Sequence, residues 1–198
     1  MITKKGKGAV MNIYAIFAND NLTGTSYKLF IKAVETLKEQ GHSVDELMLY
    51  ERAQEIPFFK HSQEFMESHP FYLENKERFL QADALLLVFP LFWYSVPGIL
   101  KAWLDMINGW AYKYESGVHA RPLHTIKKAL IIYSAMQSKE HLHKELCKPV
   151  ENQLTETLKF IGIPEIEIYI VDNVNQIDTE KLAAHLEQIT KLCKNCIN

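Results

Sequence analysis

Residues 84–100 read ALLLVFPLFWYSVPGIL, and this stretch decides the fold of the chain. Its first part, 84–89, is a continuous apolar run, which is typical of a central strand covered on both faces of a parallel sheet. Pro97 then suits the first turn of a helix, which we expect to run to about Asn108 and to end at Gly109. The stretch falls short of the roughly 20 apolar residues that span a membrane, and its two prolines interrupt it.

Short apolar runs alternate with amphipathic helical stretches on both sides of this segment. We expect further strands at 11–18, 43–49, 128–134 and 165–171. We expect helices at 25–40, 61–67, 71–82, 139–161 and 178–193, with Pro149 kinking or splitting the fourth of these. Five strands separated by helical crossovers predict an α/β fold with a doubly wound, five-stranded parallel sheet and helices on both faces.

Length and composition limit the classes of protein to consider. The chain has 198 residues, of which 47% are hydrophobic and 23% charged, and this predicts a single domain over 11–198 after a flexible leader at 1–10. A net charge of −2 gives no electrostatic footprint for nucleic acid or an anionic membrane, and no membrane insertion is expected. Three cysteines, an odd number, fit a reducing cytoplasm better than a disulfide scaffold. We expect no metal site, and we expect small molecules or other proteins as partners.

The loop between the first strand and the first helix has the composition of a phosphate-binding turn. In an open α/β sheet, ligands bind beyond the carboxyl ends of the strands. Gly24 permits a tight turn there, and Thr25 and Ser26 add hydroxyl groups to the free backbone N–H groups of the helix start. The segment has neither a Walker lysine nor a G-x-G-x-x-G pattern. An ordinary capped helix start explains it as well as a phosphate site does.

Two further loops at this end are rich in aromatic residues. Phe92, Trp93 and Tyr94 are consecutive, so they point in different directions and cannot all be core. A loop of this kind after a central strand suits a flat heteroaromatic ring. Residues 109–117 carry Trp110, Tyr112 and Tyr114, which we expect to be exposed, either at a ligand site or at a protein interface.

Residues 89–105, FPLFWYSVPGILKAWLD, followed by GWAYKY at 109–114, resemble the flavodoxin-like NAD(P)H:quinone oxidoreductases. That family includes DT-diaphorase, the modulator-of-drug-activity-B proteins and the ancillary flavoproteins of potassium efflux systems. The resemblance covers about 11–134. It implies a flavodoxin-like fold and a flavin-dependent NAD(P)H dehydrogenase that passes two electrons to a quinone, with azo and nitro compounds as further acceptors.

The resemblance also implies roles for individual residues. Thr25, Ser26 and Tyr27 match the flavin-phosphate turn of the family. Tyr112 and Tyr114 match paired tyrosines that line the substrate side of the flavin across a homodimer interface, and with Tyr133 they are the expected catalytic residues, as positioning and proton-donating groups. The remaining residues expected to bind the cofactor lie on three loops: Asn19, Pro90, Leu91, Phe92, Trp93, Tyr94, Ser134, Ala135, Met136 and Gln137.

The chain departs from the family pattern at three places. Asn19-Asp20 stands where the family has His-Pro or His-Ser, and Lys28 stands where it has asparagine. Residues 134–137 read SAMQ where many members have Thr-Thr-Gly-Gly, so this loop must approach the ring differently.

The cofactor and the exact role stay open between a few candidates. The turn and the tyrosine pair resemble the FAD-using branch, so we expect FAD, with FMN as the alternative and NADPH or NADH as the electron donor. Two other roles use the same motifs. One is a regulatory flavoprotein subunit of a membrane transporter. The other is a flavodoxin-type electron carrier, although such carriers are usually strongly acidic and this chain is nearly neutral.

Overall fold

The computed structural model describes residues 9–114, 120–146 and 148–197, so the leader expected at 1–10 lies almost wholly outside the described residues. A parallel sheet of five strands has the order β2-β1-β3-β6-β7. Numbered by their place along the chain, its strands follow the flavodoxin-like order 2-1-3-4-5. The strands are β1 (Asn12–Phe17), β2 (Ser43–Met48), β3 (Ala84–Pro90), β6 (Lys128–Ser134) and β7 (Glu165–Val171).

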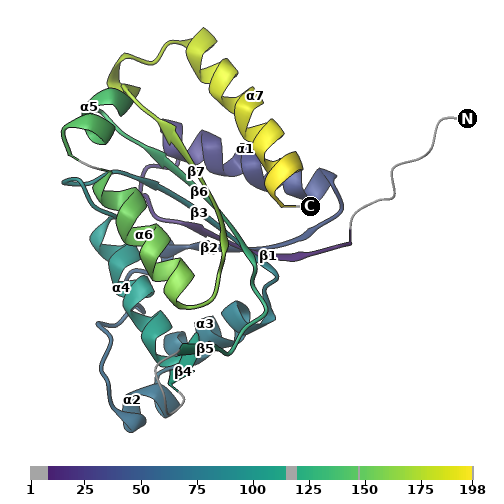
Figure 1. The fold of residues 1–198 in the computed structure, drawn as a ribbon, viewed down its shortest axis with the longest axis vertical. Helices are drawn as coiled ribbons and strands as arrows, with labels where there is room; N and C mark the ends of the chain where they lie inside the picture. Colours follow the sequence, from purple (N-terminus) through teal and green to yellow (C-terminus); the bar gives the residue numbers. More distant parts are fainter. Residues whose placement is uncertain (1–8, 115–119, 147, 198) are drawn as a thin grey trace, which may run out of the picture.

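Helices cover both faces of the sheet (Figure 1). One face packs against α1 (Thr25–Glu39) and α7 (Thr179–Cys196). The other packs against α3 (Pro70–Gln81), α4 (Gly98–Met106) and α6 (Pro149–Phe160), with the short helices α2 (Gln63–Ser68) and α5 (Lys139–Lys144) beside them. As expected, Pro149 splits the helical stretch 139–161, since it begins α6. Single 3₁₀ turns cover Leu49–Arg52, Ile107–Gly109 and Val174–Gln176.

Strand β3 is buried along its whole length, as its continuous apolar run predicted. Its side chains alternate between two cores. Leu85, Leu87 and Phe89 belong to the core under α3, α4 and α6, and Ala84, Leu86 and Val88 to the core under α1 and α7. A central strand covered on both faces therefore fixes the two-sided packing, and it delivers the loop after Pro90 to the ligand-binding end of the sheet.

A small hairpin, absent from the sequence-based expectation, follows α4. Its strands β4 (Tyr112–Tyr114) and β5 (Ala120–Pro122) pair antiparallel and form a separate two-stranded sheet. Helix α4 lies between this hairpin and the loop 91–97, so the two lie at opposite ends of the helix (Figure 1). Nine helical residues span about 13 Å.

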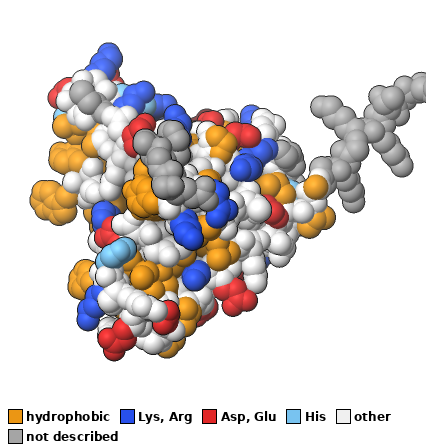
Figure 2. Space-filling view, turned by 60° about the horizontal axis from the view of Figure 1, so that its bottom comes forward, with side chains coloured by type: hydrophobic (Ala, Val, Ile, Leu, Met, Phe, Trp, Pro, Cys, Tyr) orange, Lys and Arg blue, Asp and Glu red, His pale blue; other side chains and the backbone are white. Residues whose placement is uncertain are grey.

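No helix in the described part of the chain is long and apolar enough to cross a membrane. On the face drawn in Figure 2, Lys and Arg side chains alternate with Asp and Glu, without a large area of one sign. Hydrophobic side chains gather at the left of that view, the side on which α4 and the loop before it lie in Figure 1.

Candidate functional site

The start of α1 offers free backbone donors. Gly24 precedes the helix in an extended conformation, no side chain caps the first turn, and the turn holds no acidic residue. The N–H groups of Thr25, Ser26 and Tyr27 therefore have no acceptor within the helix, and the positive end of the helix dipole lies at the same place. We call residues 24–27 the α1 turn. Its donors fit an anion such as a phosphate.

A buried contact joins the α1 turn to the end of β6. The Oγ atoms of Ser26 and Ser134 lie 2.7 Å apart, although the residues are 108 positions apart in the chain. Tyr27 is half-buried and packs edge-on against Phe17, with ring centroids 5.6 Å apart. The structure thus brings two of the segments expected to bind the cofactor, the α1 turn and the end of β6, together at the carboxyl-terminal edge of the sheet.

We call residues 91–94 the aromatic loop. It contains a strained two-residue turn, whose central residues are Trp93 and Tyr94. Phe92 and Ser95 exchange backbone hydrogen bonds of 3.0 Å in both directions, and Trp93 and Tyr94 between them have φ angles of 50° and 60°. Bulky side chains rarely adopt this left-handed region, at a cost of about 1–3 kcal/mol per residue. Trp93 is 95% exposed. The expectation that the three consecutive aromatic residues cannot all be core is confirmed.

A pocket of about 460 Å³ lies between the aromatic loop and the loop after β6. This volume is in the range of cofactor and small-molecule sites. The N–H of Leu91 donates to the carbonyl oxygen of Ser134 at 2.7 Å, which holds the two loops together. The lining residues all belong to the expected cofactor-binding set: Leu91, Phe92, Trp93, Tyr94, Met136 and Gln137.

The other expected cofactor-binding residues lie behind or beside this pocket. Pro90, Ser134 and Ala135 are buried at the ends of β3 and β6, where they support the two loops. Asn19 lies in the loop after β1, where it lines a second pocket with Asp20.

Tyr133 lies in the core rather than on the pocket wall. It is 1% exposed, and its ring stacks on Phe89 with the centroids 5.8 Å apart. Burial and the charge of the neighbouring Glu151 raise the pKa of the Tyr133 hydroxyl. Glu151 also lies 2.8 Å from Nε2 of His143. Sequence reasoning missed Glu151, because a single glutamate at a helix start carries no sign that it will be buried.

Tyr112 and Tyr114 lie on the hairpin, beyond α4 from the pocket. Their rings are 5.3 Å apart, and Phe160 of α6 packs edge-on against Tyr112 at 5.0 Å. We call these three residues the aromatic patch. Tyr114 is 66% and Phe160 50% exposed. Burial and the adjacent Tyr114 raise the pKa of Tyr112, whose hydroxyl donates to Oδ1 of Asn108 at 2.6 Å.

The expectation that Trp110 is exposed is wrong. Its ring is fully buried, 4.8 Å from the ring of Tyr72. Gly109 makes this packing possible, since a Cβ atom there would lie 2.0 Å from the Tyr72 hydroxyl oxygen. The exposed aromatic surface of this segment therefore comes from the hairpin tyrosines alone.

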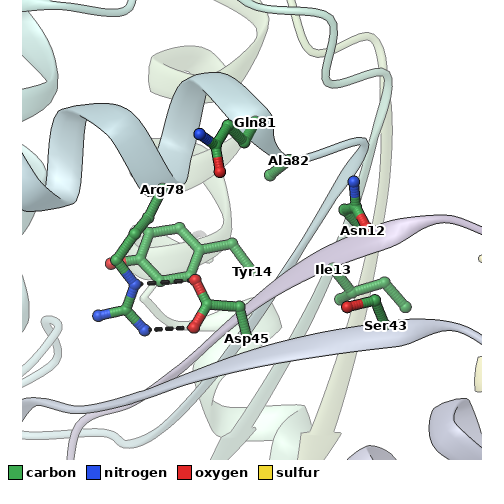
Figure 3. Close-up of a pocket in the computed structure, with 8 residues that line it drawn as sticks. All are labelled: Asn12, Ile13, Tyr14, Ser43, Asp45, Arg78, Gln81 and Ala82. Carbon is green, nitrogen blue, oxygen red and sulfur yellow. Dashed lines mark hydrogen bonds and ion pairs between the residues drawn. The ribbon is translucent and has the colours of Figure 1, made fainter.

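A pocket of about 260 Å³ at the opposite, amino-terminal edge of the sheet has a different character (Figure 3). Arg78 donates two hydrogen bonds to the Asp45 carboxylate, of 2.8 and 2.7 Å, and its guanidinium lies over the ring of Tyr14 at 4.7 Å. The charged groups that line this pocket, Arg78 and Asp45, are paired with each other. The pocket therefore stabilises the contact of α3 with β1 and β2 and offers no free charge to a ligand.

Comparison with known proteins places the chain among flavodoxin-like proteins. A family model described as flavodoxin-like fold matches residues 11–192. The solved structure of an NAD(P)H:quinone oxidoreductase from Methanothermobacter marburgensis superposes with a TM-score of 0.79, covering 94% of this chain and 96% of the other at 23% identity. That likeness concerns the fold.

Two curated relatives are similar in sequence. NAD(P)H dehydrogenase [quinone] 1 of Rattus norvegicus is 26% identical over 208 residues, which cover 90% of this chain and 75% of the relative. An FMN-dependent NADH:quinone oxidoreductase of Legionella pneumophila is 30% identical over 141 residues, which cover 66% of this chain and 65% of the relative. The family model spans nearly the whole chain, and the strand order is the one expected of this fold. The chain therefore belongs to the flavodoxin-like fold family.

Proposed function

We propose that this protein is a flavin-dependent NAD(P)H:quinone oxidoreductase. One observation carries the proposal: the α1 turn lies beside the pocket formed by the aromatic loop and the loop after β6. The contact between Ser26 and Ser134 joins the α1 turn to the strand end from which the second of these loops begins. A flavin nucleotide needs donors for a phosphate and an apolar slot for a flat ring system, and both are present at one end of the sheet. The names of the two curated relatives support NAD(P)H as donor and a quinone as acceptor.

The proposed binding mode uses the expected residues in two groups. Thr25, Ser26 and Tyr27 bind the flavin phosphate through backbone N–H groups and hydroxyls. The aromatic loop and residues 134–137 hold the ring, and Asn19 and Pro90 shape the loops that carry them. The N–H groups of Trp93 and Tyr94 have no acceptor in the described part of the chain, so they are free to donate to a polar edge of the ring.

When bound, a flavin supplies hydride chemistry between NAD(P)H and a quinone. The work of this chain is to orient the reactants and to exclude water. Fixed N–H donors at the ring edge stabilise negative charge there, because they need no reorganisation during the reaction. The rings of Phe92, Trp93 and Tyr94 limit the access of solvent. Tyr133 is buried and its pKa is raised, so we place it behind the site, where its neutral ring supports the loop after β6.

We further propose that the active unit is a homodimer in which the aromatic patch of one subunit closes the pocket of the other. Within one subunit, Tyr112 and Tyr114 follow α4, a helix of about 13 Å, whereas the aromatic loop precedes it, and neither tyrosine lines the pocket. The patch is exposed and borders a groove of about 170 Å³ between α4 and α6. Tyrosine suits this role, because its ring stacks on a flat ligand while its hydroxyl can donate a proton or a hydrogen bond.

FAD is the proposed flavin, on the resemblance of the α1 turn and the tyrosine pair to FAD-using enzymes. FMN is the second candidate, and the FMN-dependent relative favours it. The mass of the flavin that copurifies decides between them.

Steady-state kinetics test the proposed function. Because one pocket serves both substrates in turn, initial rates at several quinone concentrations are expected to give parallel double-reciprocal lines against NADH or NADPH. A protein that stays colourless after incubation with FAD and with FMN would contradict the proposal. Flavin binding without quinone reduction would instead support a flavoprotein with another role.

A further inference from the structure

The pocket between the aromatic loop and the loop after β6 has no charged side chain in its lining. In the described part of the chain, the lining contains no Asp, Glu, Lys, Arg or His and consists of Leu91, Phe92, Trp93, Tyr94, Met136 and Gln137. The nearest charged residues along the chain, Lys139 and Glu140, are exposed on α5 and do not line the pocket. A charged ligand would therefore lose water on entering without meeting a countercharge, which is costly.

Two side chains on the loop after β6 form one wall of this pocket. Met136 is 64% exposed and Gln137 is half-buried. Hydrogen bonds fix the backbone of the loop on both sides, since the N–H of Ala135 donates to the carbonyl oxygen of Val171 at 2.9 Å and the N–H of Asn173 donates to that of Gln137 at 3.3 Å. With the backbone fixed, the side chains of Met136 and Gln137 determine which ligand fits against this wall.

The polar groups of the pocket are uncharged. The side-chain amide of Gln137, the hydroxyl of Tyr94 and the indole N–H of Trp93 have no hydrogen-bond partner among the residues that the structure describes. Each of them can donate to a carbonyl oxygen. Met136 adds a flexible thioether, which packs well against aromatic rings. The lining therefore matches a flat, uncharged ring system that carries carbonyl oxygens.

The aromatic patch that we propose to close the pocket from the partner subunit is uncharged as well. It consists of the rings of Tyr112, Tyr114 and Phe160. Lys113 stands between the two tyrosines on β4, and it projects to the other face of the strand, because successive side chains of a strand alternate. Closure by these residues therefore brings no countercharge to the site.

We propose that this pocket selects uncharged acceptors over anionic ones, with Gln137 as the specificity-determining residue that donates to an acceptor carbonyl and Met136 packing against the acceptor ring. A sulfonated quinone of the same size is disfavoured, because no cation meets its charge. The reduced nicotinamide ring of NAD(P)H is uncharged and passes the same selection. The inference rests on the proposed function, since it concerns the acceptor that follows NAD(P)H in the same pocket.

Two quinones of similar size and different charge test the selection. The probes are hydroxymethylanthraquinone, which is uncharged, and anthraquinone sulfonate, which carries its negative charge at the same ring position. Each is titrated into the oxidised, flavin-loaded protein, and binding is followed by the change in flavin absorbance, so that no electron transfer contributes. The uncharged quinone is expected to bind about tenfold or more tightly.

Added cations separate this selection from a general preference for less polar compounds. Gln137→Lys and Met136→Lys are each expected to raise the affinity for the sulfonate by about tenfold, because each places an ammonium group in the pocket wall. Gln137→Ala is expected to weaken binding of the uncharged quinone by about twofold to tenfold through the lost hydrogen bond.

The matched control is Gln81→Lys, which adds the same charge at the exposed, opposite edge of the sheet and is expected to change neither affinity. Because the Met136 side chain is exposed, its lysine variant keeps the test valid if Gln137→Lys impairs folding.

Equal affinity for the two quinones, or a ratio of affinities that neither lysine in the pocket changes, would overturn the inference. The proposed function stands in that case if NADH or NADPH reduces both quinones. If the flavin-loaded protein reduces neither quinone, the proposed function fails, and the ratio of the two affinities still tests the pocket.

Discussion

The hydroxyl oxygens of Ser26 and Ser134 lie 2.7 Å apart in the interior, and they join the first turn of α1 to the end of β6. One hydrogen bond thus links the proposed phosphate site to the loop that forms one side of the proposed ring pocket. A change at either serine is therefore expected to alter both the phosphate site and the ring pocket.

Replacing Thr25 and Ser26 together by alanine tests the phosphate site. We expect flavin affinity to fall by about tenfold to a hundredfold for each hydrogen bond lost, since bonds to a charged group contribute about 1.5–3 kcal/mol. Equilibrium dialysis or fluorescence titration with flavin measures the change. The control Ser43→Ala removes an exposed hydroxyl at the opposite edge of the sheet. Unchanged flavin affinity in the folded double variant would show that the flavin phosphate does not bind at this turn.

Trp93 tests the ring pocket. Because its side chain is 95% exposed, Trp93→Ala is expected to leave the Tm nearly unchanged while it weakens flavin binding or shifts the flavin spectrum. Trp93→Gly is expected to be about 1 kcal/mol more stable than Trp93→Ala, since glycine tolerates a positive φ. Phe58→Ala, which removes a ring that is 87% exposed elsewhere, is the control. A lower Tm with unchanged flavin binding would mean that Trp93 serves only the fold.

Closure of the pocket by a partner subunit can be tested by complementation. We expect Tyr112→Ala/Tyr114→Ala to lower kcat/KM for quinone by about tenfold or more, equivalent to at least about 1.4 kcal/mol, with flavin content unchanged. In a heterodimer, this variant is paired with a second chain that cannot bind flavin but keeps Tyr112 and Tyr114. The single flavin site then lies on the tyrosine variant and faces the intact tyrosines of the second chain, so activity is expected to return. Verified heterodimers that stay inactive, or a fully active monomer, would exclude closure in trans.

His124 predicts a pH dependence of stability. Its Nδ1 accepts from the N–H of Ile126 at 3.1 Å and its Nε2 lies 2.9 Å from the carbonyl oxygen of Ile161, which requires the neutral ring. Burial lowers its pKa, so the unfolded chain binds the proton more readily. The contribution of His124 to stability is therefore complete above the ordinary histidine pKa of about 6.5 and is lost as the pH falls below it.

Denaturant unfolding between neutral and mildly acidic pH measures this effect. The stability difference between wild type and His124→Gln, whose amide can both donate and accept, is expected to shrink as the pH falls. A difference that stays constant across this range would show that His124 is not the titrating group.

The sequence predicted the five strands and the ends of β6 and β7, because uniformly apolar or alternating runs between breakers leave little choice of structure. It did not predict the hairpin, since strands of three residues are too short to show a period. The burial of Trp110 depends on Tyr72, far away in the chain, and no local pattern records that contact. The left-handed turn at Trp93 and Tyr94 contradicts local propensity, and such conflicts concentrate at functional sites.

The most direct test of the central claim follows the two half-reactions without oxygen. The purified protein, loaded with its flavin, is mixed with NADH and then with a quinone while the visible absorbance of the flavin is recorded. The account predicts that one equivalent of NADH bleaches the flavin and that one equivalent of quinone restores it, with Trp93→Ala impaired in both steps. A flavin that NADH does not bleach, or that quinone does not restore, would contradict the account.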